Sequence, residues 1–469
     1  MKLGLVSLGC DKNTVDSERI LSVLAQHGAE HTQDLGAADL VLVNTCGFID
    51  AAKEESIETL LDMSRLKRDG RCQALVAVGC LVEQYRQELE PALPEVDLFV
   101  GLRDMDRLIP ELRGRGLLGD PDPTHPGDRT PLGDLQHVRY LKVSEGCSHG
   151  CAFCAIPLWR GRHRSFEVDQ LVAEAQRLEA QGAVELNLVA QDLAHFGRDL
   201  SPRTNITELL RRLLGETTIP WFRLLYIYSA GVREELIRLV GAEERILPYL
   251  DMPIQHASDP VLERMRRPER RESLLNKFRM LRNAIPNLTL RTTVMVGFPG
   301  ETDADFRALL DFMEEVEFDR LGAFAFSPQE RTAAADMEDL YVPFDVGQER
   351  LAELLEVQRA ISADSLDREI GGIRQVLVKT AGPAPTGRTA GQADDVDGIT
   401  RLQGKVGVTP GSIVEVRVTA ADDFDLEADV LREIRPAPAT HRQLRRQPAE
   451  RPGRALPVVS IGLEGAWGK

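Results

Sequence analysis

The stretch DLVLVNTCGFI (residues 39–49) runs from a strongly apolar strand directly into a cysteine and a glycine. A short run of valine and leucine is typical of a strand buried on both faces of a parallel sheet. The same arrangement recurs in LGLVSLGC (residues 3–10) and ALVAVGC (residues 74–80), and a polar, helix-compatible segment follows each. This strand–helix alternation predicts an N-terminal parallel α/β sheet domain over residues 1–113.

The three cysteines that follow these strands are expected to be neighbours. Parallel strands end at one edge of their sheet, where open α/β sheets bind ligands. Cys10, Cys46 and Cys80, called here the N-terminal cysteines, would therefore gather into a set of soft ligands suited to iron–sulfur clusters or zinc. The alternative is that each is a small buried hydrophobic residue. Cys72 opens the strand that Cys80 closes, roughly 26 Å away in extended chain, so it is assigned a structural role.

A second set of cysteines is compact. The segment SEGCSHGCAFCAIP holds Cys147, Cys151 and Cys154, called here the loop cysteines. This spacing lets one loop surround a single centre. Three thiolates leave one metal position open, which is what chemistry at a metal requires. The alternative is a structural zinc site of three cysteines and a histidine, either His149 or His163.

The rest of the chain divides by composition. Residues 114–136 are rich in Gly, Pro and Asp and are predicted to be a linker. Residues 137–370 contain six β/α units, which predict a partial (β/α)6 barrel because a full barrel needs eight. Residues 371–437 predict a small all-β barrel, and residues 438–469, rich in Pro and Arg, predict a disordered tail. The six candidate strands of the partial barrel are HVRYLKVS, VELNLVAQ, WFRLLYI, YLDMPIQ, TLRTTVMVGF and RLGAFAFS.

Composition narrows the class of protein. The chain has 469 residues, of which 43% are hydrophobic and 28% charged, as in ordinary soluble globular proteins. No apolar run reaches membrane-spanning length and the start lacks the organisation of a signal peptide, so a cytoplasmic location is expected. Seven cysteines are too few for a secreted disulfide framework. The net charge of −17 argues against a general nucleic-acid binder and favours a basic protein partner.

The cysteine motifs resemble those of a known enzyme family. The spacing of the loop cysteines, with Phe153 before the last of them, resembles the signature of radical S-adenosylmethionine enzymes. Together with LGCDKN, VNTCGFI and VGCLVE, it resembles the methylthiotransferase family, which joins an N-terminal cysteine domain, a radical barrel and a C-terminal TRAM barrel. The segments GCDKNTVDSE, NTCGFIDAAKEESI, CAFCAIPLWRGRHRS, RTTVMVGFPGET and DDVDG resemble the branch that acts on ribosomal protein S-12 rather than the branch that acts on tRNA. The resemblance covers residues 1–437.

The resemblance implies the cofactors and the reaction. The loop cysteines would hold a 4Fe–4S cluster that binds S-adenosylmethionine, and the N-terminal cysteines a second 4Fe–4S cluster that carries the donated sulfur. A radical from S-adenosylmethionine would take hydrogen from the β-carbon of an S-12 aspartate, giving 3-methylthioaspartate. The cofactors carry this chemistry, so no catalytic side chain is assigned.

The implied partners are S-12, free or in the small subunit, and an electron donor, with nucleic acid met only through the ribosome and no membrane. Two other functions stay open: a tRNA adenosine 2-methylthiotransferase and a zinc-stabilised binding module.

Several side chains are candidates for ligand contacts. Aromatic Phe153 would pack near the adenine or serve only as an apolar loop residue. Residues at the ends of barrel strands would contact the ligand, or would only cap a helix or form a tight turn. The candidates for cofactor binding are Phe153, Gln191, Asp192, Gly297, Gly300 and Glu301.

Charged residues suggest substrate contacts. Arg160 and Arg162 in WRGRHR would pair with the target carboxylate, or would only form a solvated basic turn. The segment from 371 to 435 has eight Lys/Arg and ten Asp/Glu, so it is slightly acidic. Its acidic cluster of Asp394, Asp395 and Asp397 is expected to dock the basic S-12 protein.

Overall fold

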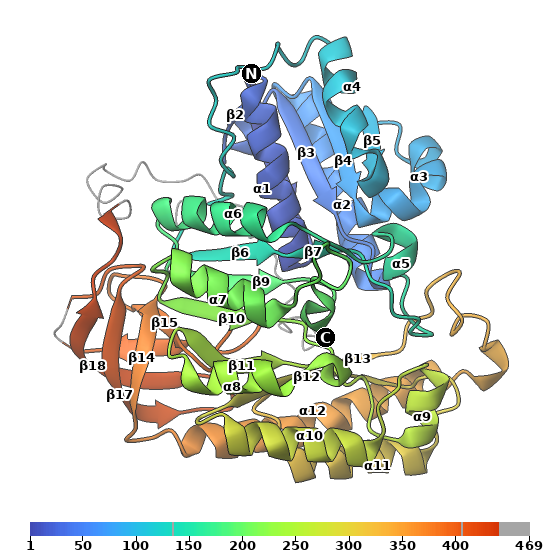
Figure 1. Ribbon diagram of the computed structural model, residues 1–469. Helices are drawn as coiled ribbons and strands as arrows, with labels where there is room; N and C mark the ends of the chain where they lie inside the picture. The colour runs from blue at the N-terminus through green and yellow to red at the C-terminus, as the bar shows by residue number, and fades with distance from the viewer. Residues whose placement is uncertain (134–135, 405–406, 440–469) are drawn as a thin grey trace. The chain divides into compact units, whose positions relative to one another are not determined.

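The computed structural model describes residues 1–133, 136–404 and 407–439 (Figure 1). These residues form two compact units. The first contains the described part of Met1–Asp134 together with Ala155–Arg162, and the second contains the described parts of Leu135–Cys154 and His163–Arg446. The segment that follows the loop cysteines therefore leaves the unit that carries them. Residues 440–469 of the predicted tail lie outside the described residues.

The first unit is the predicted parallel α/β sheet. Its five strands are parallel and lie in the order β2-β1-β3-β4-β5 (Figure 1). Strands β3 and β4 are buried along their whole length, because alternate side chains enter two different cores. Val41 and Val43 pack with α2 and α3, whereas Leu40 and Leu42 pack with α1 and α4. The elements are β1 (Lys2–Ser7), α1 (Asp11–Gln26), β2 (Glu30–His31), β3 (Leu40–Thr45), α2 (Asp50–Asp69), β4 (Ala74–Gly79), α3 (Cys80–Ala92), β5 (Leu98–Gly101), α4 (Leu108–Gly114) and α5 (Ile156–Trp159).

The second unit begins with an open six-stranded parallel sheet in the order β13-β12-β11-β10-β9-β6. All six predicted strands are confirmed, although the fourth begins and ends earlier than expected, at Ile246–Asp251. The apolar sides of the helices pack against this sheet and form a large core with it. The elements are β6 (Val138–Lys142), β7 (Ser144–Glu145), β8 (Arg164–Ser165), α6 (Val168–Ala180), β9 (Glu185–Val189), α7 (Ile206–Glu216), β10 (Trp221–Leu224), α8 (Glu234–Ala242), β11 (Ile246–Asp251), α9 (Asp259–Arg264), α10 (Arg271–Ala284), β12 (Thr289–Val296), α11 (Asp303–Val316), β13 (Arg320–Ala325) and α12 (Phe344–Asp367).

The C-terminal part of the second unit is a closed barrel in the order β14-β15-β16-β18-β17, as predicted. Its core consists mainly of valines on alternate positions of the strands, such as Val376 and Val378 on β14 and Val414 and Val416 on β17. The strands are β14 (Ile373–Val378), β15 (Thr386–Thr389), β16 (Thr400–Gln403), β17 (Ile413–Ala421) and β18 (Leu426–Arg435).

Buried charges attach this barrel to the open sheet. Glu185, at the start of β9, accepts hydrogen bonds from Arg223 Nε and Arg388 Nη2, both at 2.7 Å. All three side chains are at most 2% exposed. Buried ions of this kind persist only when they are paired and hydrogen-bonded, so the triad fixes the barrel against the start of the sheet.

The acidic cluster of the barrel belongs to the same attachment. Asp397 is 2% exposed and accepts hydrogen bonds from Tyr249 Oη and the Ala393 amide, both at 2.8 Å. Asp394 pairs with Lys379 and Arg388, and Asp395 pairs with Lys379. The docking prediction is therefore wrong for Asp394 and Asp397, because their carboxylates are already used inside the unit. Among the described residues, no helix has the length and apolar character to cross a membrane.

Candidate functional site: two sets of cysteine thiols

The N-terminal cysteines stand at the carboxyl ends of three adjacent parallel strands. Cys10 follows β1 and precedes the first residue of α1, Cys46 follows β3 directly, and Cys80 follows β4 as the first residue of α3. Since β1, β3 and β4 are neighbours in the sheet, the topology brings the three thiols to one edge. The prediction that these strand exits meet is confirmed by the strand order.

Glycines beside two of the cysteines, Gly9 and Gly79, allow this close approach. Gly9 has a φ of +88°, and a Cβ there would lie 2.8 Å from Cys46 Sγ. Gly79 has a φ of +107°, and a Cβ there would lie 2.5 Å from Asn44 Oδ1 and from Thr45 O. Such positions admit only glycine. The repeated pairing of glycine with cysteine is visible in the sequence and is a signal that could have found the site.

Polar side chains hold the first two of these strand exits. Asn13 Nδ2 donates to Leu8 O at 2.8 Å and to Thr45 O at 3.3 Å, so it bridges the first two exits. Ser56 Oγ accepts from the Cys46 amide at 3.0 Å and donates to Cys46 O at 2.8 Å. These hydrogen bonds hold the backbone around the thiols without using the thiols themselves, which is what a preorganised metal site needs.

Arg160 completes the N-terminal site. It follows α5, and its side chain is 2% exposed. Its Nη2 lies 2.5 Å from Asn13 Oδ1 and 3.5 Å from Cys80 Sγ, and its Nη1 lies 3.2 Å from Asp16 Oδ2. The guanidinium expected to hold a substrate carboxylate is thus engaged within the first unit. Arg162, its exposed neighbour, keeps no such contact with the thiols in the described structure.

Burial raises the pKa of two of these thiols, those of Cys46 and Cys80. It raises the pKa of Cys46 to about 12, and the nearby Cys10 and Cys80 add to the rise. Burial also raises the pKa of Cys80 to about 11, although the Arg160 guanidinium opposes this. Thiols of this kind are protonated near neutral pH, so a metal must displace their protons when it binds.

The loop cysteines lie in one irregular segment between β7 and α5. Backbone hydrogen bonds anchor this segment: Ala152 N donates to Met265 O at 3.0 Å, and Ala334 N donates to Ala152 O at 2.8 Å. Within the loop, the His149 amide lies 3.4 Å from Cys147 Sγ. Burial raises the pKa of Cys147 to about 11. The structure therefore holds this set through its local backbone rather than through a sheet.

Both histidines proposed as zinc ligands bind other side chains through Nε2. His149 Nε2 lies 2.8 Å from Asp192 Oδ2, and its ring stacks on Tyr228 with centroids 4.2 Å apart. His163 Nε2 lies 3.1 Å from Ser165 Oγ. The donor atoms of His149, Asp192 and His195 lie within 4.8 Å of one another, but the His149–Asp192 hydrogen bond makes this an orienting network. The observed contacts thus favour three thiols without a histidine.

Three of the candidate cofactor residues lie near the loop or at the end of β9. Phe153 packs edge-on against Phe298, with centroids 6.5 Å apart. Gln191 Nε2 lies 3.3 Å from Glu145 Oε1. Asp192 accepts from Ala194 N, which caps a short 3-10 turn, and from Tyr228 N. Asp192 therefore has the capping role that the sequence left open, together with its contact to His149.

The other three candidates follow β12. Gly297 and Gly300 both have positive φ, as a tight turn requires. The Gly300 carbonyl accepts from Arg264 Nη2 at 2.7 Å. Glu301 is 4% exposed and pairs with Arg350 Nη1 at 2.9 Å. The turn is thus observed, and the Glu301 carboxylate is used in an internal ion pair.

Sequence reasoning missed a second arginine near a thiol. Arg267 Nη1 lies 4.0 Å from Cys151 Sγ, and its guanidinium lies over the Tyr228 ring at 4.0 Å. Glu269 accepts from Arg267 Nη2 at 3.3 Å and from Ser229 Oγ at 2.6 Å. Nothing in the local pattern around Arg267 marked it, because it is more than a hundred residues from Cys151 in the chain.

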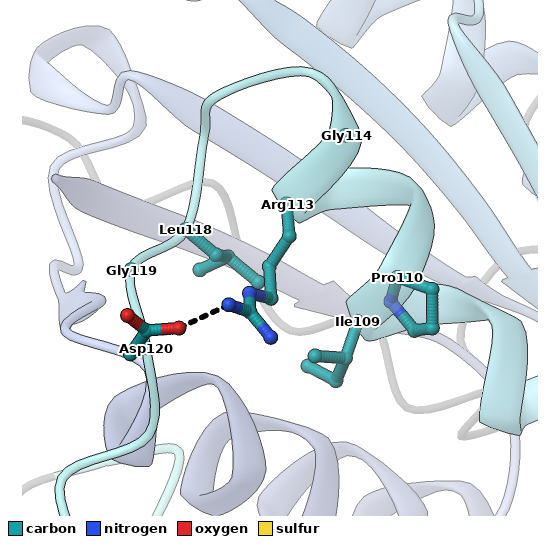
Figure 2. A pocket seen from close by; sticks show the side chains of 7 residues that line it. All are labelled: Ile109, Pro110, Arg113, Gly114, Leu118, Gly119 and Asp120. Carbon is teal, nitrogen blue, oxygen red and sulfur yellow. Dashed lines mark hydrogen bonds and ion pairs between the residues drawn. The ribbon is translucent and has the colours of Figure 1, made fainter.

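A surface hollow of ≈ 550 Å³ lies elsewhere in the first unit. Figure 2 shows Arg113 reaching across it to pair with Asp120. It contains no cysteine and therefore adds no chemistry to either thiol set. Its lining consists of Ile109, Pro110, Arg113, Gly114, Leu118, Gly119 and Asp120.

The donor sets fit iron–sulfur clusters. Each set consists of three free cysteine thiols, and soft thiolates are the ligands such clusters use. Arginine N–H groups beside a sulfur in each set would stabilise the charge of bound thiolates. A site with three protein ligands keeps one metal position for another molecule.

Three family models match successive parts of the chain. Residues 2–101 match an uncharacterized protein family (UPF0004), residues 141–313 match the radical SAM superfamily, and residues 370–431 match the TRAM domain. The first match covers the N-terminal cysteines, and the second covers the loop cysteines.

Solved structures and curated relatives complete the comparison. A radical S-adenosylmethionine methyltransferase, TsrM from Kitasatospora setae, superposes with a TM-score of 0.51 at 16% identity over 69% of this chain and 72% of its own, which shows a shared fold. "Ribosomal protein uS12 methylthiotransferase RimO" of Anaeromyxobacter sp. (strain K) is 44% identical over 93% of this chain and 96% of its own length. The protein of the same name from Geobacter sulfurreducens is 42% identical over 92% and 98%. The chain therefore belongs to the RimO family of ribosomal protein uS12 methylthiotransferases.

Proposed function

We propose that this protein is a radical S-adenosylmethionine enzyme that adds a methylthio group to the β-carbon of an aspartate in ribosomal protein uS12. The observation that carries the proposal is the presence of two separate three-thiol sites in one chain, one on a sheet edge and one in a loop. A single cluster suffices to start a radical, so a second set of ligands points to a second task. Sulfur donation is such a task.

The side chains divide the work between the two sites. When bound, two 4Fe–4S clusters and S-adenosylmethionine supply the radical chemistry, the sulfur and the methyl group. The loop cysteines hold one cluster, and the backbone bonds to Met265 and Ala334 fix their loop. The N-terminal cysteines hold the other. The raised thiol pKa values mean that loading either site releases protons.

Contacts with S-adenosylmethionine belong to the same proposal. We assign Phe153, Gln191, Asp192 and the Gly297 turn to its surroundings, because Gln191 and Asp192 follow the carboxyl end of a barrel strand, where barrel enzymes bind their ligands. Gly300 and Glu301 stabilise this turn, because the Gly300 carbonyl accepts a hydrogen bond from Arg264 and the Glu301 carboxylate pairs with Arg350.

We propose domain boundaries that give each cluster its own domain. We assign residues 1–113 to the second cluster, 137–370 to the radical reaction and 371–437 to the TRAM barrel, with 114–136 as the linker between the first two. Residues 438–469 are proposed as a tail.

The substrate is proposed from the names of the relatives. Those proteins carry uS12 in their names, and the net charge of −17 suits a basic protein partner. Because the proposed substrate is a ribosomal protein, we also propose a cytoplasmic location. The reduction of the cluster requires an electron donor in the same compartment. Arg162, which is exposed, stays a candidate contact for the substrate carboxylate. The tRNA activity has no specific observation in its favour.

The test offers both substrates to one enzyme. The chain is purified without oxygen, its clusters are reconstituted, and reductant and S-adenosylmethionine are added with uS12 and tRNA in parallel reactions. Mass spectrometry should show a methylthio group on one aspartate of uS12 and none on tRNA. Modified tRNA with unchanged uS12 would contradict the proposal, and zinc without iron in the purified protein would favour a binding module.

A further inference from the structure

The position of Arg160 in the structure could not be expected from its position in the sequence. It stands six residues after Cys154, the last of the loop cysteines, yet it belongs to the first unit with the N-terminal cysteines. Its neighbour Trp159 is 1% exposed and packs with Ala155 against Cys80. A buried aromatic ring of this size gives the segment a fixed position on the thiol. The guanidinium that follows is held there as well.

Each terminal nitrogen of the Arg160 guanidinium contacts its own acceptor atoms. One nitrogen, Nη2, reaches both Asn13 Oδ1 at 2.5 Å and Cys80 Sγ at 3.5 Å, while Nη1 reaches Asp16 Oδ2 at 3.2 Å. The planar fork of arginine presents its N–H groups to these three acceptors in a fixed geometry, whereas a lysine ammonium is a compact point charge on a flexible stem. Asn13 in turn donates to Leu8 O and Thr45 O, so Arg160 acts on the backbone of two strand exits as well as on one sulfur.

We propose that Arg160 is a positioning residue for the second cluster, and that its N–H contact with Cys80 sulfur raises the reduction potential of the cluster held by the N-terminal cysteines. This rests on the proposed function, in which those cysteines carry a 4Fe–4S cluster. Hydrogen bonds to the sulfurs, net charge and burial are the means by which a protein sets such a potential. Arg160 supplies the first two in a site where the third strengthens them.

The direction of the effect follows from charge. When one electron passes from added dithionite to the cluster, the negative charge on the cluster and its thiolates grows by one. A fixed cation next to a sulfur stabilises that extra charge, so the potential rises. Asp16, paired with the same guanidinium and 17% exposed, partly cancels the cation. Arg160 and Asp16 should therefore move the potential in opposite directions when either loses its charge.

The experiment uses the full chain with all three loop cysteines replaced by alanine, so that only the N-terminal cluster remains. Dithionite titrations followed by electron paramagnetic resonance compare this background with Arg160→Gln, Arg160→Lys and Asp16→Asn. We expect a more negative midpoint potential for Arg160→Gln, a smaller negative shift for Arg160→Lys and a more positive potential for Asp16→Asn. Arg162→Gln removes an equal charge from the exposed neighbour and should leave the potential unchanged.

The outcomes are separable. If the background itself binds no iron, the assignment of a cluster to the N-terminal cysteines fails, and with it the proposed function. If it binds iron and neither Arg160→Gln nor Asp16→Asn moves the potential, the inference about Arg160 is overturned while the proposed function stands. Shifts of the same sign in both variants would also overturn it, since a loosened site has no reason to distinguish the two charges. Should Arg160→Gln fail to fold, the positive shift of Asp16→Asn decides.

Discussion

The two thiol sites bring the same ligands together by different means. The N-terminal cysteines come from three strand ends that are about 35 residues apart in sequence, and glycines without room for a Cβ let the exits close on one another. The loop cysteines lie within eight residues, and two backbone bonds anchor their segment. A site assembled by topology depends on the whole sheet, whereas a site in one loop depends on local contacts.

The largest expected effect is a loss of activity that differs between substitutions at the two thiol sites. Cys46→Ala should remove the second cluster and about half of the iron, because each cluster needs its own thiolates. Reductive cleavage of S-adenosylmethionine should continue, while methylthiolation of uS12 stops. Cys151→Ala should abolish both. Iron and sulfide analysis, chromatography of 5′-deoxyadenosine and mass spectrometry of uS12 measure the three quantities. Full iron content in Cys46→Ala would show that its thiol is not a ligand.

The architecture was largely predictable from the sequence. Runs such as DLVLVNT and TLRTTVMVGF are short, apolar and rich in branched residues, so they predicted the strands of two parallel sheets and, by their direction, the shared edge of the first. The start of β11 at Ile246 lies outside the predicted strand, and Pro248 interrupts the apolar run there, a residue that is unusual inside a strand.

The contacts of single side chains were less predictable. Arg160 follows the loop cysteines in sequence and was assigned to the substrate, because a local pattern does not reveal that the chain changes unit at Ala155. The sequence predicts a docking role for Asp394 and Asp397, since it does not reveal that Arg388, Arg291 and Tyr249 bind their carboxylates. Charge counts describe surfaces only when burial is known.

The next largest effect concerns the attachment of the TRAM barrel, which lies at the opposite end of β9 from Asp192. Glu185→Gln leaves two buried arginines with less negative charge and should cost about 3–5 kcal/mol of unfolding free energy. If the loop site depends only on local contacts, its iron content should survive this change below the new melting temperature. Calorimetry and iron analysis test both statements. Glu415→Gln, which breaks an exposed pair of the same barrel, should leave the melting temperature unchanged.

The triad of Glu185, Arg223 and Arg388 also makes the stability of the fold depend on pH. Burial alone would raise the pKa of Glu185, but Arg388 and Arg223 outweigh it, so the pKa lies below its usual value. A carboxyl of this kind stabilises the fold above its unfolded pKa of about 4.3, and the contribution is lost as the pH falls through the lowered pKa. The difference in melting temperature between the natural chain and Glu185→Gln should therefore shrink from about pH 7 to about pH 3. A difference that grows in acid would contradict the pairing.

Glycine substitutions test the assembly of the two sites directly. Gly79→Ala places a Cβ 2.5 Å from two oxygen atoms in a backbone conformation with φ of +107°, which should cost about 1–3 kcal/mol and reduce iron at the N-terminal cysteines. Gly150→Ala, between two loop cysteines, meets no atom within 4 Å and should leave both iron content and unfolding free energy close to the natural values. Equal losses in the two variants would remove the distinction between the sites.

The smallest expected effect compares the two arginines that approach a thiol. Arg267 lies 4.0 Å from Cys151 Sγ, against 3.5 Å for Arg160 and Cys80 Sγ. Its guanidinium also donates to Pro253 O and Glu269 and covers the Tyr228 ring, so less of its charge is directed at the sulfur. In a chain whose N-terminal cysteines are alanine, Arg267→Gln should therefore move the midpoint potential of the loop cluster in the negative direction by less than Arg160→Gln moves that of the second cluster. A larger shift at Arg267 would mean that the loop site, and not the sheet edge, relies more on a neighbouring cation.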